Sequence, residues 1–270
     1  LIAGSGELPL AFLRNSRRAG RDVFVCALRG ITSPRGEALS CRTAWLRVGQ
    51  LGALVRVLKQ AGIREAVMEG QVKLSSVFAV RPDLLGLRVL AGLKVRSGEA
   101  ILRAVGRVLV REGIRLLDCR TNMETLLAGK GILAGPAPSP ALRRDLSVAF
   151  RAARALAGLE AGQTAVVKEG VLVALEGLEG TDACLRRGAA LAGPGCSAAK
   201  VSSARRDFRF DVPTVGPRTL TILRSCGYRA LAVEAGRAFV LGGEGFLSRA
   251  GKARGDIHRR GIRRAQPVER

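Results

Sequence analysis

The sequence predicts an α/β protein built from two domains, an N-terminal one with a parallel sheet and a C-terminal one of mixed α/β structure. The chain has 270 residues, more than the commonest length of a single domain. Short apolar runs alternate with amphipathic segments through the first half, which is typical of strand-helix-strand units and a parallel sheet. A segment rich in glycine and proline then separates the two halves.

The first half begins with a strand, a glycine turn and a helix. Residues 1–3 and 23–28 are the first two expected strands, and the helix between them begins near Pro9, since proline suits a first helical turn. A helix over 51–60 follows from the leucines and valine that share one of its faces. The other expected elements of this half are strands at 45–48, 65–68 and 114–117 and helices at 82–93 and 99–111. This order predicts a Rossmann-like domain.

Three glycines and three prolines fall within residues 129–140, too many for a helix or a central strand. We place the boundary near residue 135, with domains at 1–134 and 135–248. A Glu169-Gly170 pair in the second half predicts a tight hairpin. The elements expected here are helices at 141–156, at 182–191 and from Pro217, and strands at 164–167, 171–175, 198–201, 208–210, 230–233 and 238–241.

The net charge of +23 favours anionic partners: phosphates, nucleic acid or an acidic lipid surface. Because only seven of the 45 basic residues are lysine, a general arginine bias of the genome would explain the charge equally well. Residues 249–270 carry eight Lys or Arg against two acids, and we expect a mobile basic tail there. The tail is either simply solvated or attached to anionic lipid.

Several classes of protein are disfavoured. The six cysteines form no CxxC pair and the single histidine, His258, lies in the tail, which argues against zinc sites and cysteine or serine nucleophiles paired with histidine. We expect the cysteines to be small buried apolar residues. No apolar run approaches the 18 or so residues of a membrane span, so we expect a cytoplasmic protein.

Three motifs could carry chemistry, and the first is Gly4-Ser5-Gly6. It lies between the first strand and the first helix, where backbone amides can hold a phosphate. A dinucleotide fingerprint would need a third glycine at position 9, where Pro9 stands. A plain tight turn is the alternative.

The second motif, Glu176-Gly177-Leu178-Glu179-Gly180-Thr181-Asp182, places three carboxylates in a glycine-rich turn before a helix. Carboxylate oxygens are the ligands that Mg²⁺ prefers. Alternatively, Thr181 or Asp182 caps the helix.

The third motif is Asp207-Phe208-Arg209-Phe210-Asp211-Val212-Pro213. Its alternation predicts a strand with Asp207, Arg209 and Asp211 on one face and the apolar side chains on the other. Arginine binds phosphate through two hydrogen bonds and a carboxylate can hold a metal or accept a proton from water, so the face suits a metal and phosphate site. A structural ladder of ion pairs is the alternative.

Together these segments resemble the LpxI-type UDP-2,3-diacylglucosamine diphosphatases of lipid A biosynthesis. The resemblance runs from residues 2–9 to residues 233–236, and its densest parts are Glu179-Gly180-Thr181-Asp182 and Arg209-Phe210-Asp211-Val212-Pro213-Thr214-Val215-Gly216. Other matching segments are Gly49-Gln50-Leu51-Gly52, Glu69-Gly70-Gln71-Val72 and Gly162-Gln163. The chain departs from the family at Ser202-Ser203-Ala204-Arg205-Arg206 and at Gly98-Glu99.

The resemblance implies Mg²⁺-dependent attack of water on the α-phosphorus of UDP-2,3-diacylglucosamine, giving UMP and 2,3-diacylglucosamine 1-phosphate (lipid X). The family's catalytic aspartate matches Asp211. We therefore expect Asp211, Arg209 and Asp182 to be catalytic and Asp211, Glu179 and Asp182 to hold Mg²⁺. The residues that we expect to bind substrate are Gly4, Ser5, Gly6, Thr181, Lys200 and Thr214.

The expected partners are the nucleotide-linked glycolipid and the anionic inner-membrane surface, with no nucleic acid and with a homodimer as one assembly to consider. The rival interpretations are a basic α/β protein that binds nucleic acid or nucleotide without hydrolase activity, and a dinucleotide-dependent oxidoreductase. The chain has one Trp and one Tyr, which disfavours binding of single-stranded nucleic acid by base stacking. The missing third glycine disfavours the oxidoreductase.

Overall fold

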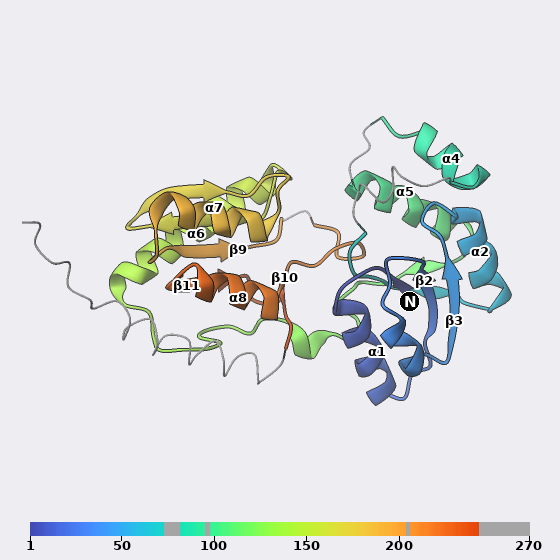
Figure 1. Cartoon of the computed structure of the whole chain (residues 1–270). Coiled ribbons are helices and arrows are strands. Elements are labelled where there is room, and N and C mark those ends of the chain that lie inside the picture. Colours follow the sequence, from blue (N-terminus) through green and yellow to red (C-terminus); the bar gives the residue numbers. More distant parts are fainter. Residues whose placement is uncertain (73–81, 95–97, 204–205, 243–270) are drawn as a thin grey trace, which may run out of the picture. The chain divides into compact units, whose positions relative to one another are not determined.

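A computed structural model describes residues 1–72, 82–94, 98–203 and 206–242, and its chain forms two compact units (Figure 1). Unit 1 contains Leu1–Thr125 together with Asp207–Asp211, and unit 2 contains Leu126–Arg206 and the chain from Val212 onward. The first passage between the units thus precedes the boundary that we placed near residue 135. The return of five residues to unit 1 was not predicted. The expected basic tail, 249–270, lies outside the described residues.

Unit 1 is built on a parallel sheet, as predicted. Its strand order is β3 (Arg42–Leu46), β2 (Phe24–Leu28), β1 (Ile2–Ala3) and β5 (Met68–Glu69). The neighbouring strands β3, β2 and β1 have the 3-2-1 order that is found in half of a doubly wound nucleotide-binding sheet. The strand expected at 65–68 is divided into β4 (Glu65–Ala66) and β5. The strand expected at 114–117 is confirmed as β6 (Arg115–Leu116), and it pairs with β4 in parallel.

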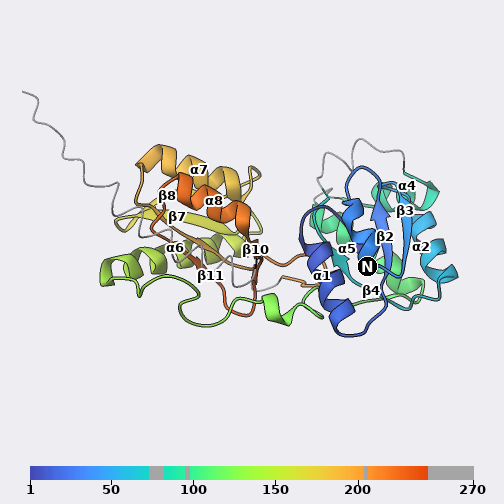
Figure 2. The same cartoon turned by 60° about the horizontal axis from the view of Figure 1, so that its bottom comes forward.

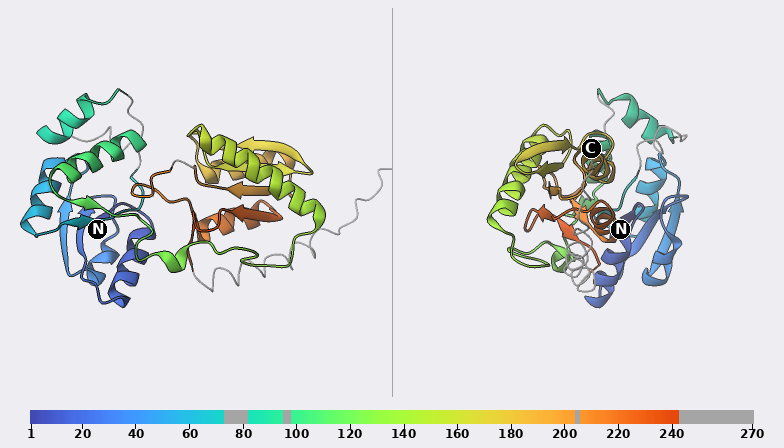
Figure 3. Two further views of the ribbon diagram at one scale, coloured as in Figure 1. Left: turned by 180° about the vertical axis from the view of Figure 1, so that it is seen from behind. Right: turned by 60° about the vertical axis from the view of Figure 1, so that its left-hand side comes forward.

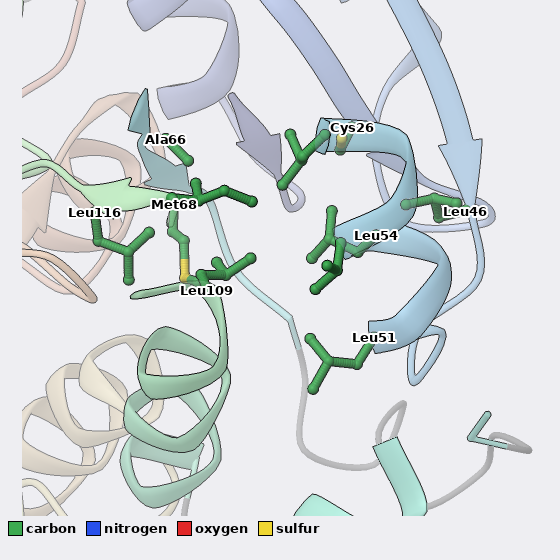
Figure 4. Close-up of a cluster of buried hydrophobic side chains, with 11 residues drawn as sticks. Cys26, Leu46, Leu51, Leu54, Ala66, Met68, Leu109 and Leu116 are labelled. Atoms are coloured by element: carbon green, nitrogen blue, oxygen red, sulfur yellow. The ribbon is translucent and has the colours of Figure 1, made fainter. Parts of the chain in front are cut away.

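Helices cover both faces of this sheet, and Figure 2 shows α1 (Leu8–Arg18) and α2 (Leu51–Gln60) on opposite sides of the strands. Because successive strand residues point to opposite faces, Cys26 joins a core with α2 while Val25 and Ala27 lie toward α1. The α2 side also includes α5 (Gly98–Arg111). Figure 4 shows its buried side chains, among them Leu46, Leu54, Met68 and Leu109.

The side chain of Asp83 accepts hydrogen bonds at the N-termini of two helices in this unit. The Oδ2 atom of Asp83 accepts hydrogen bonds from the backbone N–H groups of Gly52 at 2.7 Å and Ala53 at 3.1 Å, in the first turn of α2. Its Oδ1 atom accepts from Gly86 N at 2.9 Å, which caps α4 (Leu84–Ala91). Asp83 therefore satisfies backbone donors that would otherwise lack partners at two helix N-termini.

Unit 2 holds a mixed sheet in the order β11 (Ala230–Val233), β9 (Ser197–Lys200), β7 (Thr164–Lys168) and β8 (Val171–Leu175). The predicted β7–β8 hairpin is confirmed: the strands are antiparallel, and Glu169 and Gly170 turn with φ angles of 51° and 81°. The buried carboxylate of Asp145 accepts from both turn amides, at 3.2 and 2.7 Å.

This sheet is also covered on both faces. Helix α6 (Pro140–Gly158) packs its alanines against Ala165, Val167 and Ala199, whereas Val166 and Ala198 point to a core formed with α7 (Thr181–Ala192) and α8 (Pro217–Ser225). Figure 1 shows α7 and α8 in front of the sheet, and Figure 3 (left), seen from behind, shows α6 in front. The close contact of α7 requires a small residue, because a Cβ atom on Gly188 would lie 2.8 Å from Val166.

The strand predicted at 208–210 is wrong. Asp207–Phe210 form a turn in which Phe210 N donates to Asp207 O at 3.1 Å and Arg209 N donates to the Asp207 carboxylate at 3.1 Å. An aspartate that accepts from the backbone two residues ahead favours such a turn over a strand. The short strand in this region is β10 (Thr214–Val215), which pairs with β12 (Phe239–Val240).

Four of the six cysteines are buried: Cys26, Cys119, Cys184 and Cys196. The expectation of small apolar residues therefore holds for these four, whereas Cys41 is exposed and Cys226 is partly exposed. Over the described parts of the chain, we find no helix long and apolar enough to cross a bilayer.

Candidate functional site

The turn that carries Asp211 is anchored in unit 1. Cys119 N donates to Phe208 O at 2.8 Å, and the buried Phe208 ring lies 4.0 Å below the guanidinium of Arg120. The Phe210 ring packs on the core and fills the space beside Gly106, where an added Cβ atom would lie 3.0 Å from the ring. Two aromatic anchors therefore hold the turn in place, and Asp211 follows it with an exposed side chain.

A second carboxyl group, that of Glu69, lies within electrostatic reach of Asp211. Glu69 ends β5 and is 4% exposed, and among the described residues its Oε1 atom has no hydrogen-bond partner. Its pKa is raised to about 8, first by burial and then by the charge of Asp211, while a hydrogen bond with Cys119 acts in the opposite direction. At neutral pH Glu69 is therefore mostly protonated beside the exposed Asp211.

Arg209 is paired with Asp207. Its Nε and Nη2 atoms donate to the two carboxylate oxygens at 2.9 and 2.6 Å, and this contact lowers the pKa of Asp207. The ion pair that we considered as the alternative is thus present, although it belongs to a turn and not to a strand. The guanidinium carries five N–H donors. The two bonds to Asp207 use Nε and Nη2, and Nη1 takes no part in them.

The glycine turn at the end of β1 is joined to the chain that follows β5. Gly4 N donates to Glu69 O at 2.7 Å, while Ser5 and Gln71 exchange two backbone hydrogen bonds. The Ser5 hydroxyl also donates to Gln71 O, at 2.9 Å. These groups of Gly4 and Ser5 are thus engaged inside unit 1. Gly6, with a φ angle of 96°, turns the chain into α1. Pro9, the second residue of that helix, has no N–H group, so only Leu8 and Leu10 have backbone N–H groups at this helix start.

The expected acidic turn lies in unit 2, before α7. The Glu179 carboxylate accepts from Gly177 N and from Arg187 Nη2, and the contact with Arg187 lowers the pKa of Glu179. The Asp182 carboxylate pairs with Arg218 Nε at 2.5 Å. Each acid therefore has an arginine partner.

Thr181 does not cap α7 through its side chain, because the capping residue is Gly180, with no side-chain cap bond. Its hydroxyl donates to the buried carboxylate of Glu176 at 3.1 Å. Also in unit 2, the buried Lys200 donates through Nζ to Thr214 O at 2.9 Å. Lys200 and Thr214 are therefore in direct contact.

The expected metal ligands are divided between the units, with Asp211 in unit 1 and Glu179 and Asp182 in unit 2. Within the described ranges, no group of three or more His, Cys, Asp or Glu side chains is arranged to hold a metal ion.

Glu69 is the residue that the sequence interpretation missed. It was quoted within a matching segment but was not named as a site residue. The available signal was an acidic residue at the end of a predicted strand, directly before a glycine. The carboxyl ends of parallel strands are where α/β proteins bind ligands.

Comparison with known proteins identifies the family. The model of the LpxI N-terminal domain matches residues 1–126, and that of the LpxI C-terminal domain matches residues 129–255. The chain belongs to the LpxI family. A protein named UDP-2,3-diacylglucosamine pyrophosphatase LpxI, from Caulobacter vibrioides, is 31% identical over 261 residues, which cover 93% of this chain and 92% of that protein. The resemblance to LpxI expected from the motifs is confirmed.

Proposed function

We propose that this LpxI family member hydrolyses the diphosphate of UDP-2,3-diacylglucosamine, with water attacking the α-phosphorus to release UMP and 2,3-diacylglucosamine 1-phosphate. In that role it would be an enzyme of lipid A biosynthesis. The observation that carries the proposal is the similarity to the Caulobacter protein, which extends over both domains and nearly the full length of each chain.

In this proposal Asp211 is the central catalytic residue. Its carboxylate is exposed while the residues before it are anchored in unit 1, so it can meet a substrate without losing its position. Asp211 would hold Mg²⁺ or accept a proton from the attacking water. Bound Mg²⁺ would neutralise charge on the diphosphate oxygens.

Arginine supports the same chemistry in both units. In unit 1, Asp207 fixes the guanidinium plane of Arg209, which would donate from Nη1 to a phosphate oxygen. In unit 2, Glu179 and Asp182 would bind a metal in place of their arginine partners, Arg187 and Arg218. Each exchange would free a guanidinium to bind phosphate.

We further propose that the protein works at an anionic membrane surface. The implied substrate carries acyl chains, and the net charge of +23 favours attraction to acidic lipid. Because this attraction is electrostatic, sedimentation with vesicles containing an anionic lipid should weaken as salt is raised.

The test is release of UMP from UDP-2,3-diacylglucosamine with and without Mg²⁺. Asp211→Ala is compared with Asp22→Ala, which removes another exposed aspartate of unit 1. We expect metal-dependent release by the parent protein and by Asp22→Ala, and loss of release in a folded Asp211→Ala protein. Equal rates in all three would remove Asp211 from the mechanism, and no release by any would refute the proposed activity.

A further inference from the structure

Helix α4 is apolar on its outer side as well as on its inner side. Inward, Leu85 and Val89 pack on the core of unit 1, and Gly86 lies so close to Gly49 O that it leaves no room for a Cβ atom. Arg88 is the single polar residue in the sequence of this helix. A helix at the surface of a globular protein normally places polar residues on its outer side, so α4 departs from that pattern.

The outward residues of α4 share one face. Leu84 is 64% exposed and Leu87 is 55% exposed, and Ala91 is exposed one turn further along. Because these positions are three and four residues apart, their side chains are neighbours on the helix surface. Figure 1 shows α4 at the outer edge of unit 1, beyond α5. The chain therefore leaves a small apolar face open to its surroundings.

Basic side chains accompany this face. Arg88 is exposed beside the leucines, and the exposed Lys94 follows the end of the helix. Arg47 is exposed in the turn at 47–50, which is tied to the start of α4 by a hydrogen bond of 3.2 Å from Asp83 N to Gly49 O. Apolar side chains flanked by cations complement the surface of an anionic bilayer, where acyl chains lie beneath negatively charged headgroups.

A second copy of the chain fits this face less well. A stable interface covers roughly 800 Å² of each partner, which is more than two leucines and an alanine can offer. In a twofold dimer the same patch meets itself, and the like charges of Arg88 and Lys94 would then be brought together. An anionic lipid surface requires neither a large apolar area nor a neutral rim.

We propose that the face formed by Leu84, Leu87 and Ala91 docks on an anionic phospholipid surface. The two leucines enter the boundary between headgroups and acyl chains, and Arg88 extends its stem along that boundary while its guanidinium contacts headgroup phosphates. The inference rests on the proposed function, since it names the part of the protein that attaches to the membrane. Burial of the leucines is not screened by salt, unlike the attraction due to net charge.

The test is sedimentation with vesicles of phosphatidylcholine and phosphatidylglycerol. The double variant Leu84→Gln/Leu87→Gln removes the apolar face, and Leu159→Gln/Leu191→Gln removes two exposed leucines of unit 2 as the matched control. All four positions are exposed, so the variants should fold, which urea unfolding checks. Both double variants should release UMP from a soluble analogue with acetyl groups at the rate of the parent.

We expect the parent and the control to bind the vesicles equally and Leu84→Gln/Leu87→Gln to bind at least tenfold more weakly. Loss of two buried methylenes, at roughly fourfold each, is sufficient for this. The ratio between parent and variant should persist as salt is raised, whereas Arg88→Gln should weaken binding roughly fivefold at low salt only. Equal binding by all proteins, or an equal loss in the control, would overturn the assignment to α4.

A fluorescence measurement reports insertion directly. Leu87→Trp and Leu191→Trp each add one indole to Trp45, and the vesicles contain phosphatidylcholine brominated in its acyl chains. Quenching should be stronger in Leu87→Trp, and equal quenching in both would refute insertion of α4. If Leu84→Gln/Leu87→Gln instead dissociates a dimer and binds vesicles like the parent, the face joins two copies and the inference is wrong.

The inference and the proposed hydrolysis fail in different ways. Vesicle binding that depends on α4 without UMP release would refute only the hydrolase function. UMP release by a parent protein that does not bind the vesicles would refute the docking and leave the hydrolysis standing.

Discussion

Because Glu69 is buried in its protonated form, the stability of unit 1 should fall as the pH rises. Its pKa is raised from the ordinary 4.5 to about 8, mainly by burial, so between these values the folded state retains a proton that the unfolded state releases. The free energy of unfolding then falls by about 1.4 kcal/mol per pH unit. Across the whole window the loss amounts to about 5 kcal/mol, and it levels off above the folded pKa.

Glu69→Gln removes this titration while nearly preserving the shape of the side chain. Any change in packing or hydrogen bonding caused by the amide is independent of pH. The difference in free energy of unfolding between the parent protein and Glu69→Gln should therefore shift by about 5 kcal/mol, in favour of the variant, from about pH 4.5 to pH 9.

The assay is urea unfolding in EDTA between pH 4.5 and 9, followed by the fluorescence of Trp45. This is the single tryptophan of the chain and lies in β3, so it reports on unit 1. Glu7→Gln, at an exposed position, is the control and should show no such shift. A difference between parent and Glu69→Gln that stays constant over this pH range would refute the buried, protonated carboxyl.

Three further substitutions test the packing of the fold by urea unfolding. Asp83→Ala should cost about 1–2 kcal/mol for each helix start that loses its acceptor, whereas Asp83→Asn should retain part of that stability. Gly188→Ala should destabilise unit 2 by about 1–3 kcal/mol, because the new Cβ atom would overlap Val166, and a smaller residue at 166 should restore part of the loss. Asp145→Ala should cost about 1–3 kcal/mol by leaving the hairpin amides without their acceptor, and a loss below about 0.5 kcal/mol would contradict that role.

The sequence predicted much of the fold because its local signals agree with the tertiary structure. The apolar face of α2 predicted Leu51–Gln60 without error, and the Glu169-Gly170 pair predicted a hairpin that the left-handed backbone at both residues confirms. The motifs also predicted the family, which the comparisons confirm.

The turn at 207–210 shows where a sequence pattern fails. Alternation of polar and apolar residues is compatible with a strand, but the Asp207 carboxylate can also accept from nearby backbone amides, and that local bond prevails. The burial of Glu69 depends on side chains distant in sequence, such as Cys119. No local sequence pattern could therefore predict that Glu69 is buried. The roles assigned to the site residues stay predictions.

The return of residues 207–211 to unit 1 has a consequence for dissecting the protein by genetic means. The peptide chain passes between the units at 125/126, 206/207 and 211/212, so neither unit corresponds to one uninterrupted stretch of the gene. A fragment ending at residue 126, the limit of the LpxI N-terminal match, would lack Phe210 and expose the apolar surface that it covers. It would also lack Asp211. A chimaera that exchanges the N-terminal and C-terminal halves between relatives would therefore combine Asp211 from one parent with the unit 1 core from the other. If the two halves are expressed as separate chains, a native unit 1 should form only when the two chains bind each other.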